Sequence, residues 1–324
     1  MNRYNWLGLA LALASSAAFG TSGSLAKGLL VAGWSPAGAV TWRVGLGALA
    51  LLLPAALAMR GRWGSLARGW PTVLLFGLVA VAGCQLAYFL AVERLSVAIA
   101  LLLEYLGVIL VVVWLWLRRA QRPRPLTLVG ACLAVLGLVL VLDVFGAVTI
   151  DVIGVVWGLV AAFGLATFFV VSADDRSGLP PIVMASGGLL VGAVVLLLAG
   201  WAGVVPFAWN TSEVVLAGYR VPWWLDIAAL GLFAAAFAYV TGILAARRLG
   251  SKLASFVGLS EVLFAVLWAW LLLGELPVAI QLLGGALILA GVILVKLDEG
   301  PRRASAPEVA PEKLSWPEEP VQEA

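Results

Sequence analysis

Residues 77–95 read GLVAVAGCQLAYFLAVERL, and they align without gaps to residues 231–249, which read GLFAAAFAYVTGILAARRL. Each stretch is a long apolar run with charged residues near its end, Glu93 and Arg94 in the first and Arg247 and Arg248 in the second. A helix that rises 1.5 Å per residue needs about 20 such residues to cross a hydrocarbon layer of ~30 Å. The pair therefore predicts a membrane protein that contains a duplicated unit.

The composition of the whole chain agrees with this. Its 324 residues are 63% hydrophobic and 11% charged, with a mean hydropathy of +1.09, whereas soluble domains are about 45–50% apolar and about 25% charged. A water-soluble fold is excluded because so few charges cannot cover a globule of this size. Histidine is absent, which excludes a histidine metal site and a Ser-His triad. Cys84 and Cys132 lie in apolar runs, so we expect small core residues and no metal or cofactor site.

Hydropathy divides the chain into ten spans, and we expect an all-α membrane protein without β-barrel strands. The predicted spans are Trp6–Ala26, Pro36–Met59, Pro71–Val92, Val97–Leu117, Leu126–Leu142, Ile153–Val171, Pro181–Trp201, Trp223–Ala246, Ala254–Leu273 and Val278–Leu297.

Basic residues set the expected orientation of these spans. If the N-terminus is cytoplasmic, most of the 20 Lys and Arg residues lie on the cytoplasmic side, and the outer segments hold only Lys27, Arg94 and Arg220. The positive-inside rule then places both termini in the cytoplasm. Residues 298–324 are rich in Pro, Glu and Ala without an apolar period, which predicts a disordered cytoplasmic tail.

The duplication extends over two units, residues 1–145 and 150–297. The motif AAFG at residues 17–20 recurs at 161–164, and Gly130 and Gly137 align with Gly284 and Gly291. Each unit has five spans, an odd number, so the second unit must be inverted in the membrane relative to the first. Inverted repeats are typical of secondary transporters, in which two similar halves expose one central site alternately to each side. The first span could also be read as a signal peptide, but it has a counterpart in the second unit.

The pattern of repeats and of charged and small residues resembles that of a known transporter family. Two five-helix repeats, each with a glutamate early in its fourth helix, resemble the drug/metabolite transporter (DMT) superfamily, and EamA-type repeats in particular. The second half carries the fuller pattern, with Ser260-Glu261, Leu273-Gly274-Glu275 and Gly284-Gly285-Ala286. The family often has proline after the glutamate, whereas Tyr105 and Val262 follow here. Length and pattern are most similar to those of the YddG-type amino-acid exporters of bacterial inner membranes. This resemblance implies export of aromatic and other neutral amino acids through a central cavity.

Three ionisable residues fall well inside predicted spans, where each charge costs at least ~2.5 kcal/mol on insertion scales and is therefore a functional candidate. Arg43 and Glu104 lie at similar depth, ~10–12 Å from the outer surface, so they can form a buried pair or serve only to anchor their helices. Glu261 lies ~10 Å from the cytoplasmic end, and Gly188 occupies the position equivalent to Arg43. Glu261 is therefore protonated, hydrogen-bonded near serines, or exposed to a wet vestibule, and it could carry a proton during transport.

The wall of the expected substrate cavity needs polar groups and aromatic surfaces. Such side chains share faces of the predicted helices, although helix packing or lipid contact would equally explain any single aromatic residue. The candidates are Ser22, Gln85, Tyr88, Trp157, Phe168, Tyr239 and Trp268.

The leading hypothesis is therefore a secondary transporter that exports amino acids by alternating access, with protons as a possible coupling partner. The alternatives are an exporter or facilitator of quaternary amines, nucleosides, sugars or drugs, and a channel-like facilitator. The sequence has no phosphate-binding G-x-x-x-x-G-K-[ST] loop, so this chain should not pump with ATP. Spans without histidine or clustered carboxylates do not favour an enzyme. We expect no nucleic-acid partner, and the sequence leaves a monomer or a homodimer open.

Overall fold

A computed structural model describes residues 3–61, 63–92, 94–95, 97–142, 151–274 and 276–298. The expected disordered tail lies outside these residues, apart from Asp298. The first half contains α1 (Arg3–Val31), α2 (Pro36–Ala58), α3 (Trp63–Leu75), the π-helical η1 (Phe76–Gly83), α4 (Cys84–Val92), α5 (Val97–Tyr105), α6 (Gly107–Arg119) and α7 (Pro125–Val141). The second half contains α8 (Val152–Ser172), α9 (Pro181–Trp201), β1 (Val214–Leu216), β2 (Tyr219–Val221), α10 (Trp223–Gly231), the π-helical η2 (Leu232–Phe237), α11 (Ala238–Leu249), α12 (Ser251–Gly258), α13 (Ser260–Leu273) and α14 (Ala279–Asp298).

Every predicted span is helical in the structure. Within the described ranges, nine helical stretches are long and apolar enough to cross a membrane, and α7 is a shorter apolar helix of 17 residues. The helix that contains the third predicted span begins at Trp63 rather than at Pro71, because a charged segment ends a hydrocarbon span without ending a helix. Large apolar side chains such as Leu53 and Leu198 are exposed on the outer faces of the bundle, a surface that lipid rather than water must cover. The chain is a multi-pass membrane protein.

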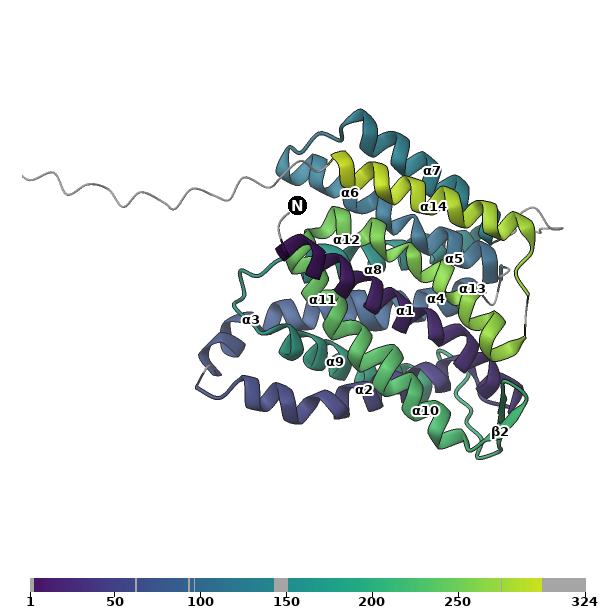
Figure 1. Ribbon diagram of the computed structural model, residues 1–324. Helices are drawn as coiled ribbons and strands as arrows, with labels where there is room; N and C mark the ends of the chain where they lie inside the picture. Colours follow the sequence, from purple (N-terminus) through teal and green to yellow (C-terminus); the bar gives the residue numbers. More distant parts are fainter. Residues whose placement is uncertain are drawn as a thin grey trace, which may run out of the picture.

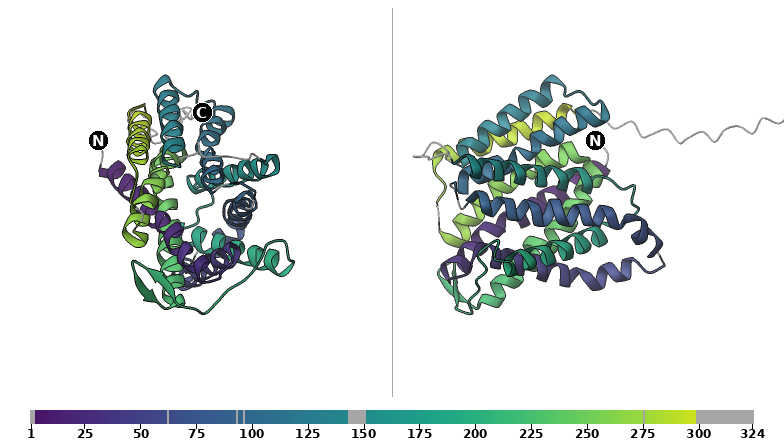
Figure 2. Two further views of the ribbon diagram at one scale, coloured as in Figure 1. Left: turned by 90° about the vertical axis from the view of Figure 1, so that its right-hand side faces the viewer. Right: turned by 180° about the vertical axis from the view of Figure 1, so that it is seen from behind.

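Helices from the two halves pack against each other (Figures 1 and 2). Helix α7 lies along α14, α2 lies along α9, α1 packs against α11 and α13, and α8 packs against α4, α5 and α6. The largest buried cluster of apolar side chains lies where these layers meet, and it includes Phe76, Phe168, Leu189 and Ile243. The core is therefore built jointly by the two halves rather than separately within each.

The two ends of the bundle are held by different contacts. At the hairpin end, β1 and β2 pair antiparallel, the Trp34 indole donates to the Asn210 carbonyl at 2.6 Å, and the Ala217 N–H donates to the Leu272 carbonyl of α13 at 2.7 Å. This hairpin was not predicted from the sequence. At the opposite end, the Thr127 hydroxyl of α7 hydrogen-bonds the Asp298 carboxylate of α14.

Candidate functional site

Arg43 is the buried cation at the centre of the candidate site. Its Nη2 donates to the Ala234 carbonyl at 2.7 Å, its guanidinium lies 5.7 Å from the centre of the Phe19 ring, and the residue is 7% exposed. Ala234 belongs to η2, and π-helical turns are found preferentially at functional positions. Helix α2 therefore brings a positive charge against an irregular helix of the second half.

Two carboxylates, one from each half, share the electrostatic environment of Arg43. Glu104 is near the end of α5 and Glu261 is at the start of α13, and each interacts electrostatically with the guanidinium and with the other carboxylate. The predicted direct pair of Arg43 and Glu104 is not among the ion pairs of the described residues. The guanidinium instead bonds a backbone carbonyl, so its single positive charge acts on the two carboxylates at longer range and can balance only one of them.

Each carboxylate has a polar side chain beside it. The Cys84 thiol of α4 lies 3.3 Å from Glu104 Oε1 and 3.4 Å from the Ala161 carbonyl oxygen of α8, and it can donate its one proton to either. The Tyr105 hydroxyl interacts electrostatically with the Glu261 carboxylate. Because Tyr105 follows Glu104 in the chain, the two acids are connected through adjacent residues of one helix.

The helix that carries each glutamate is interrupted beside it. Leu106 separates α5 from α6, and Leu259 separates α12 from α13. Around these points N–H groups bond carbonyls three residues earlier, as in the 3.2 Å bond from Leu106 to Leu103 and the 3.2 Å bond from Val262 to Leu259. Proline is not needed at either interruption. Discontinuous helices near the middle of the bilayer are where secondary transporters bind substrates and coupling ions.

Aromatic rings pack beside these charges. Tyr239 lies 5.1 Å from Phe19 and 5.6 Å from Phe168, measured between ring centres, and Phe76 lies 5.6 Å from Phe168. The two contacts of Tyr239 are edge-to-face, which is a favourable arrangement of aromatic rings. Two of the predicted residues, Phe168 and Tyr239, thus contact the ring of Phe19, and this ring in turn contacts the Arg43 guanidinium.

The other predicted residues lie at varying distances from this cluster. On α4, Gln85 and Tyr88 are partly buried, and Tyr88 interacts electrostatically with Glu104. On α13, the Trp268 indole donates to the Ala17 carbonyl of α1 at 2.9 Å, so its polar edge is used in helix packing. On α1, the buried hydroxyl of Ser22 has no hydrogen-bond partner within the described part of the chain.

Trp157 lies in the second turn of α8 and is partly buried. Among the described aromatic contacts, none joins it to the Phe19–Phe168–Tyr239 group.

Sequence reasoning missed three buried residues. Cys84 was expected only to pack, but its thiol contacts Glu104, and Cys132 is exposed on α7 rather than buried. Tyr105 was noted only as the residue that replaces a proline. Asp226 is 1% exposed within α10, and it could have been found as a fourth ionisable residue in a predicted span.

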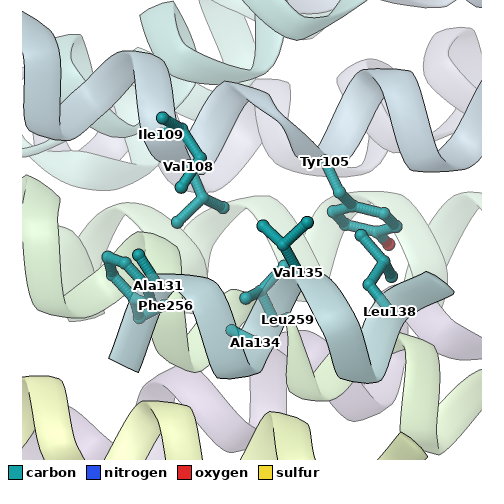
Figure 3. Close-up of a pocket in the computed structure, with 9 residues that line it drawn as sticks. All are labelled: Tyr105, Val108, Ile109, Ala131, Ala134, Val135, Leu138, Phe256 and Leu259. Carbon is teal, nitrogen blue, oxygen red and sulfur yellow. The ribbon is translucent and has the colours of Figure 1, made fainter. Parts of the chain in front are cut away.

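Figure 3 shows a small apolar pocket beside this region, between α5, α6, α7 and α12. Its wall includes Tyr105, Val108, Leu138 and Phe256, and its volume is about 10 Å³. A cavity of that size holds about one water molecule. It is too small for an amino acid, and its apolar wall gives no charged partner for one.

Comparisons with known proteins agree with this architecture. The profile of the EamA-like transporter family matches residues 6–143 and again residues 152–297. The chain is 27% identical over 243 residues to an uncharacterised inner membrane transporter, YicL, of Salmonella typhimurium (72% of this chain, 75% of that protein). It is 26% identical over 292 residues to the threonine/homoserine exporter RhtA of Escherichia coli (89% of this chain, 90% of that protein). A solved crystal structure matches with a TM-score of 0.72 at 20% identity, over 90% of this chain and 96% of that one, and this shows the shared fold.

These relatives are named as transporters, so the chain is a transporter and not an enzyme. The family profile matches the chain twice, once in each half, and the two matches cover most of its length. The chain therefore belongs to the EamA-like transporter family of the drug/metabolite transporter superfamily.

Proposed function

We propose that this transporter exports amino acids, aromatic and other neutral ones, across a bacterial inner membrane by alternating access. The observation that carries the proposal is the buried group of three charges that Arg43, Glu104 and Glu261 form. The Arg43 guanidinium interacts electrostatically with both carboxylates. A neutral amino acid carries one carboxylate and one ammonium group. The guanidinium can attract the first, and the acid that Arg43 does not fully compensate can attract the second.

The aromatic residues beside this charge cluster support substrates with apolar or aromatic side chains. Phe19, Phe168 and Tyr239 offer ring edges and faces next to Arg43, and rings of this kind pack favourably against other rings. The similarity to a threonine/homoserine exporter over 89% of the chain also supports amino acids as the substrate class.

Reciprocal glycine contacts support the inverted repeat that alternating access requires. A Cβ on Gly130 would meet the Gly291 carbonyl at 2.7 Å, and one on Gly284 would meet the Gly137 carbonyl at 2.6 Å. In the sequence alignment, Gly130 corresponds to Gly284 and Gly137 to Gly291. Exchanging the two halves therefore turns the first contact into the second, as a twofold relation between the halves predicts.

The packing of α1 and α8, the first helices of the two halves, supports the same relation. Helix α1 packs against α11 and α13 of the second half, and α8 packs against the equivalent helices α4 and α6 of the first half. The π-helical segments η1 and η2 also fall in aligned stretches. We infer two antiparallel five-helix units, with the hairpin end outside and both termini in the cytoplasm.

We test the function with the purified full-length chain in proteoliposomes, by counterflow of labelled amino acids, quaternary amines, nucleosides and sugars. We expect saturable counterflow of aromatic and other neutral amino acids. The variant Arg43→Gln should lose it, and Arg60→Gln, which removes an exposed charge, should retain it. Counterflow with another class only would contradict the amino-acid assignment, and non-saturating flux would favour a channel-like facilitator.

A further inference from the structure

Asp226 is a buried carboxylate that the proposed transport site does not use. It lies in the first turn of α10, at the hairpin end, and is 1% exposed. Among the residues that the structure describes, none hydrogen-bonds either of its carboxylate oxygens. An ionised carboxylate without partners is strongly disfavoured away from water, so this side chain needs a physical explanation.

Three elements converge on this carboxylate. A Cβ placed on Gly28 of α1 would lie 2.4 Å from Val214 Cγ1 of β1 and 3.6 Å from Asp226 Oδ2. Val214 packs in an apolar cluster with Leu29 of α1 and Leu230 of α10. Figure 1 shows the hairpin beside α10 at this end of the bundle. Helix α1 and the hairpin residue Val214 thus lie beside the buried carboxylate, and Gly28 has no side chain that would hold them apart.

Of the described charged groups on the surrounding elements, none bonds Asp226. Lys27 of α1 is exposed, and on the hairpin side Arg220 and Glu213 pair with each other at 3.6 Å with largely exposed side chains. On α2, Arg43 bonds the Ala234 carbonyl. The described residues contain no group of three potential metal ligands, and a single carboxylate is a poor site for a metal cation. The ligand that fits one isolated carboxylate is a proton.

We propose that Asp226 is a proton-binding site on the outer side of the transporter, and that its protonation favours closure of the β1–β2 hairpin over α1 and α10. When the hairpin opens, water reaches the carboxylate and the ionised form becomes favourable. When it closes, only the neutral form is accommodated. This site is separate from Glu104 and Glu261, and it does not depend on the identity of the substrate.

Proton linkage gives the direction in which pH shifts the opening equilibrium of the hairpin, and the largest shift that one proton can cause. Because the closed hairpin binds one proton more than the open hairpin, closure weakens as the pH rises on that side. One proton can change the opening equilibrium by at most about tenfold per pH unit. Acid outside therefore closes the hairpin, and alkali outside opens it.

Hydrogen exchange of the hairpin tests this in the full-length chain embedded in lipid nanodiscs. The measurement is the protection of the amides of residues 214–221 from mildly acidic to mildly alkaline pH, corrected for the intrinsic effect of pH on exchange. In the wild type we expect protection to fall with rising pH, by up to about tenfold per unit. Asp226→Asn should keep high protection at every pH, and the control Glu213→Gln should behave as the wild type does.

Several results would overturn the proposal. If the protection of the wild-type hairpin did not change with pH, that result alone would overturn the proposal. It needs no variant, so it stands even if Asp226→Asn fails to fold. The same pH dependence in Asp226→Asn would assign the effect to another group. Protection restored at alkaline pH by sodium alone would replace the proton with a metal cation and would also contradict it.

Discussion

The indole Nε1 of Trp268 on α13 donates a 2.9 Å hydrogen bond to the backbone carbonyl of Ala17 on α1. The bond joins the first helix of one half to the helix that carries Glu261 in the other. One turn of α1 away, Gly20 lets the helices approach, since a Cβ there would lie 2.9 Å from the Ala265 backbone nitrogen. The position of Glu261 therefore depends on this contact between α1 and α13.

Trp268→Phe keeps an aromatic ring but removes the donor. We expect a loss of about 1–2 kcal/mol of stability, from the lost bond and the smaller ring. The measurement is the thermal unfolding of the detergent-solubilised protein. Trp270→Phe changes a 44% exposed indole of the same helix and should have little effect. Equal losses in the two variants would show that the hydrogen bond is not what stabilises the contact.

Gly284→Ala tests the contact between α7 and α14. A Cβ at this position would lie 2.6 Å from the Gly137 carbonyl and 2.8 Å from the Val141 nitrogen, so the helices must separate. We expect a loss of about 1–3 kcal/mol, as is typical of overpacking, measured by thermal unfolding. The control Gly23→Ala, in open space on α1, should be neutral or slightly stabilising because alanine is the better helix former. A neutral Gly284→Ala would contradict the close approach of the two helices.

Charge compensation around Arg43 makes a separate prediction. Arg43→Gln leaves two carboxylates without their cation, and breaking a buried charge arrangement costs about 3–5 kcal/mol. Adding Glu104→Gln removes one uncompensated acid. The double variant should therefore be more stable than Arg43→Gln alone, while both fail to transport. Thermal unfolding of the two single variants and the double variant forms the double-mutant cycle. Strictly additive losses would show that Arg43 and Glu104 are not coupled.

Glu261→Gln tests whether this carboxylate carries a proton. If Glu261 takes up a proton on one side of the membrane and releases it on the other, wild-type transport in proteoliposomes should respond to an imposed pH gradient. The glutamine variant cannot ionise, and we expect its transport to be independent of the gradient. Glu213→Gln, at the exposed hairpin, is the matched control. A gradient response that persists in Glu261→Gln would remove the proton-carrying role.

The ten helical spans could be located from the sequence alone because a span needs about 20 consecutive apolar residues, and hydropathy detects such runs without any contact information. The helix interruptions at Leu106 and Leu259 could not be located in this way. Neither residue is a proline, and the breaks arise where neighbouring helices from the other half pack against the chain. Their position can be seen only when both halves are assembled.

The candidate site was predicted in part for a similar reason. Arg43, Glu104 and Glu261 were identifiable because any charge inside a span is conspicuous. The contact of Cys84 with Glu104 depends on how α4 and α5 approach each other, and composition carries no signal for it. Asp226 is also an ionisable residue in a predicted span, but it is less conspicuous because it lies near the end of that span, where a carboxylate would ordinarily reach water. The hairpin beside it comes from a loop without a strong strand pattern.

The proposed inverted arrangement of the two halves predicts on which side of the membrane equivalent residues lie. Arg94 and Arg248 occupy aligned positions, so they should lie on opposite sides of the membrane. A membrane-impermeant maleimide should label Arg94→Cys in intact cells, and it should label Arg248→Cys only after permeabilisation. Arg220→Cys and Arg176→Cys, in exposed segments, report the outer and inner sides, and the wild type gives the background from its two native cysteines. If Arg94→Cys and Arg248→Cys were labelled from the same side, the halves would be parallel, and alternating access by exchange of two antiparallel units would have no structural basis.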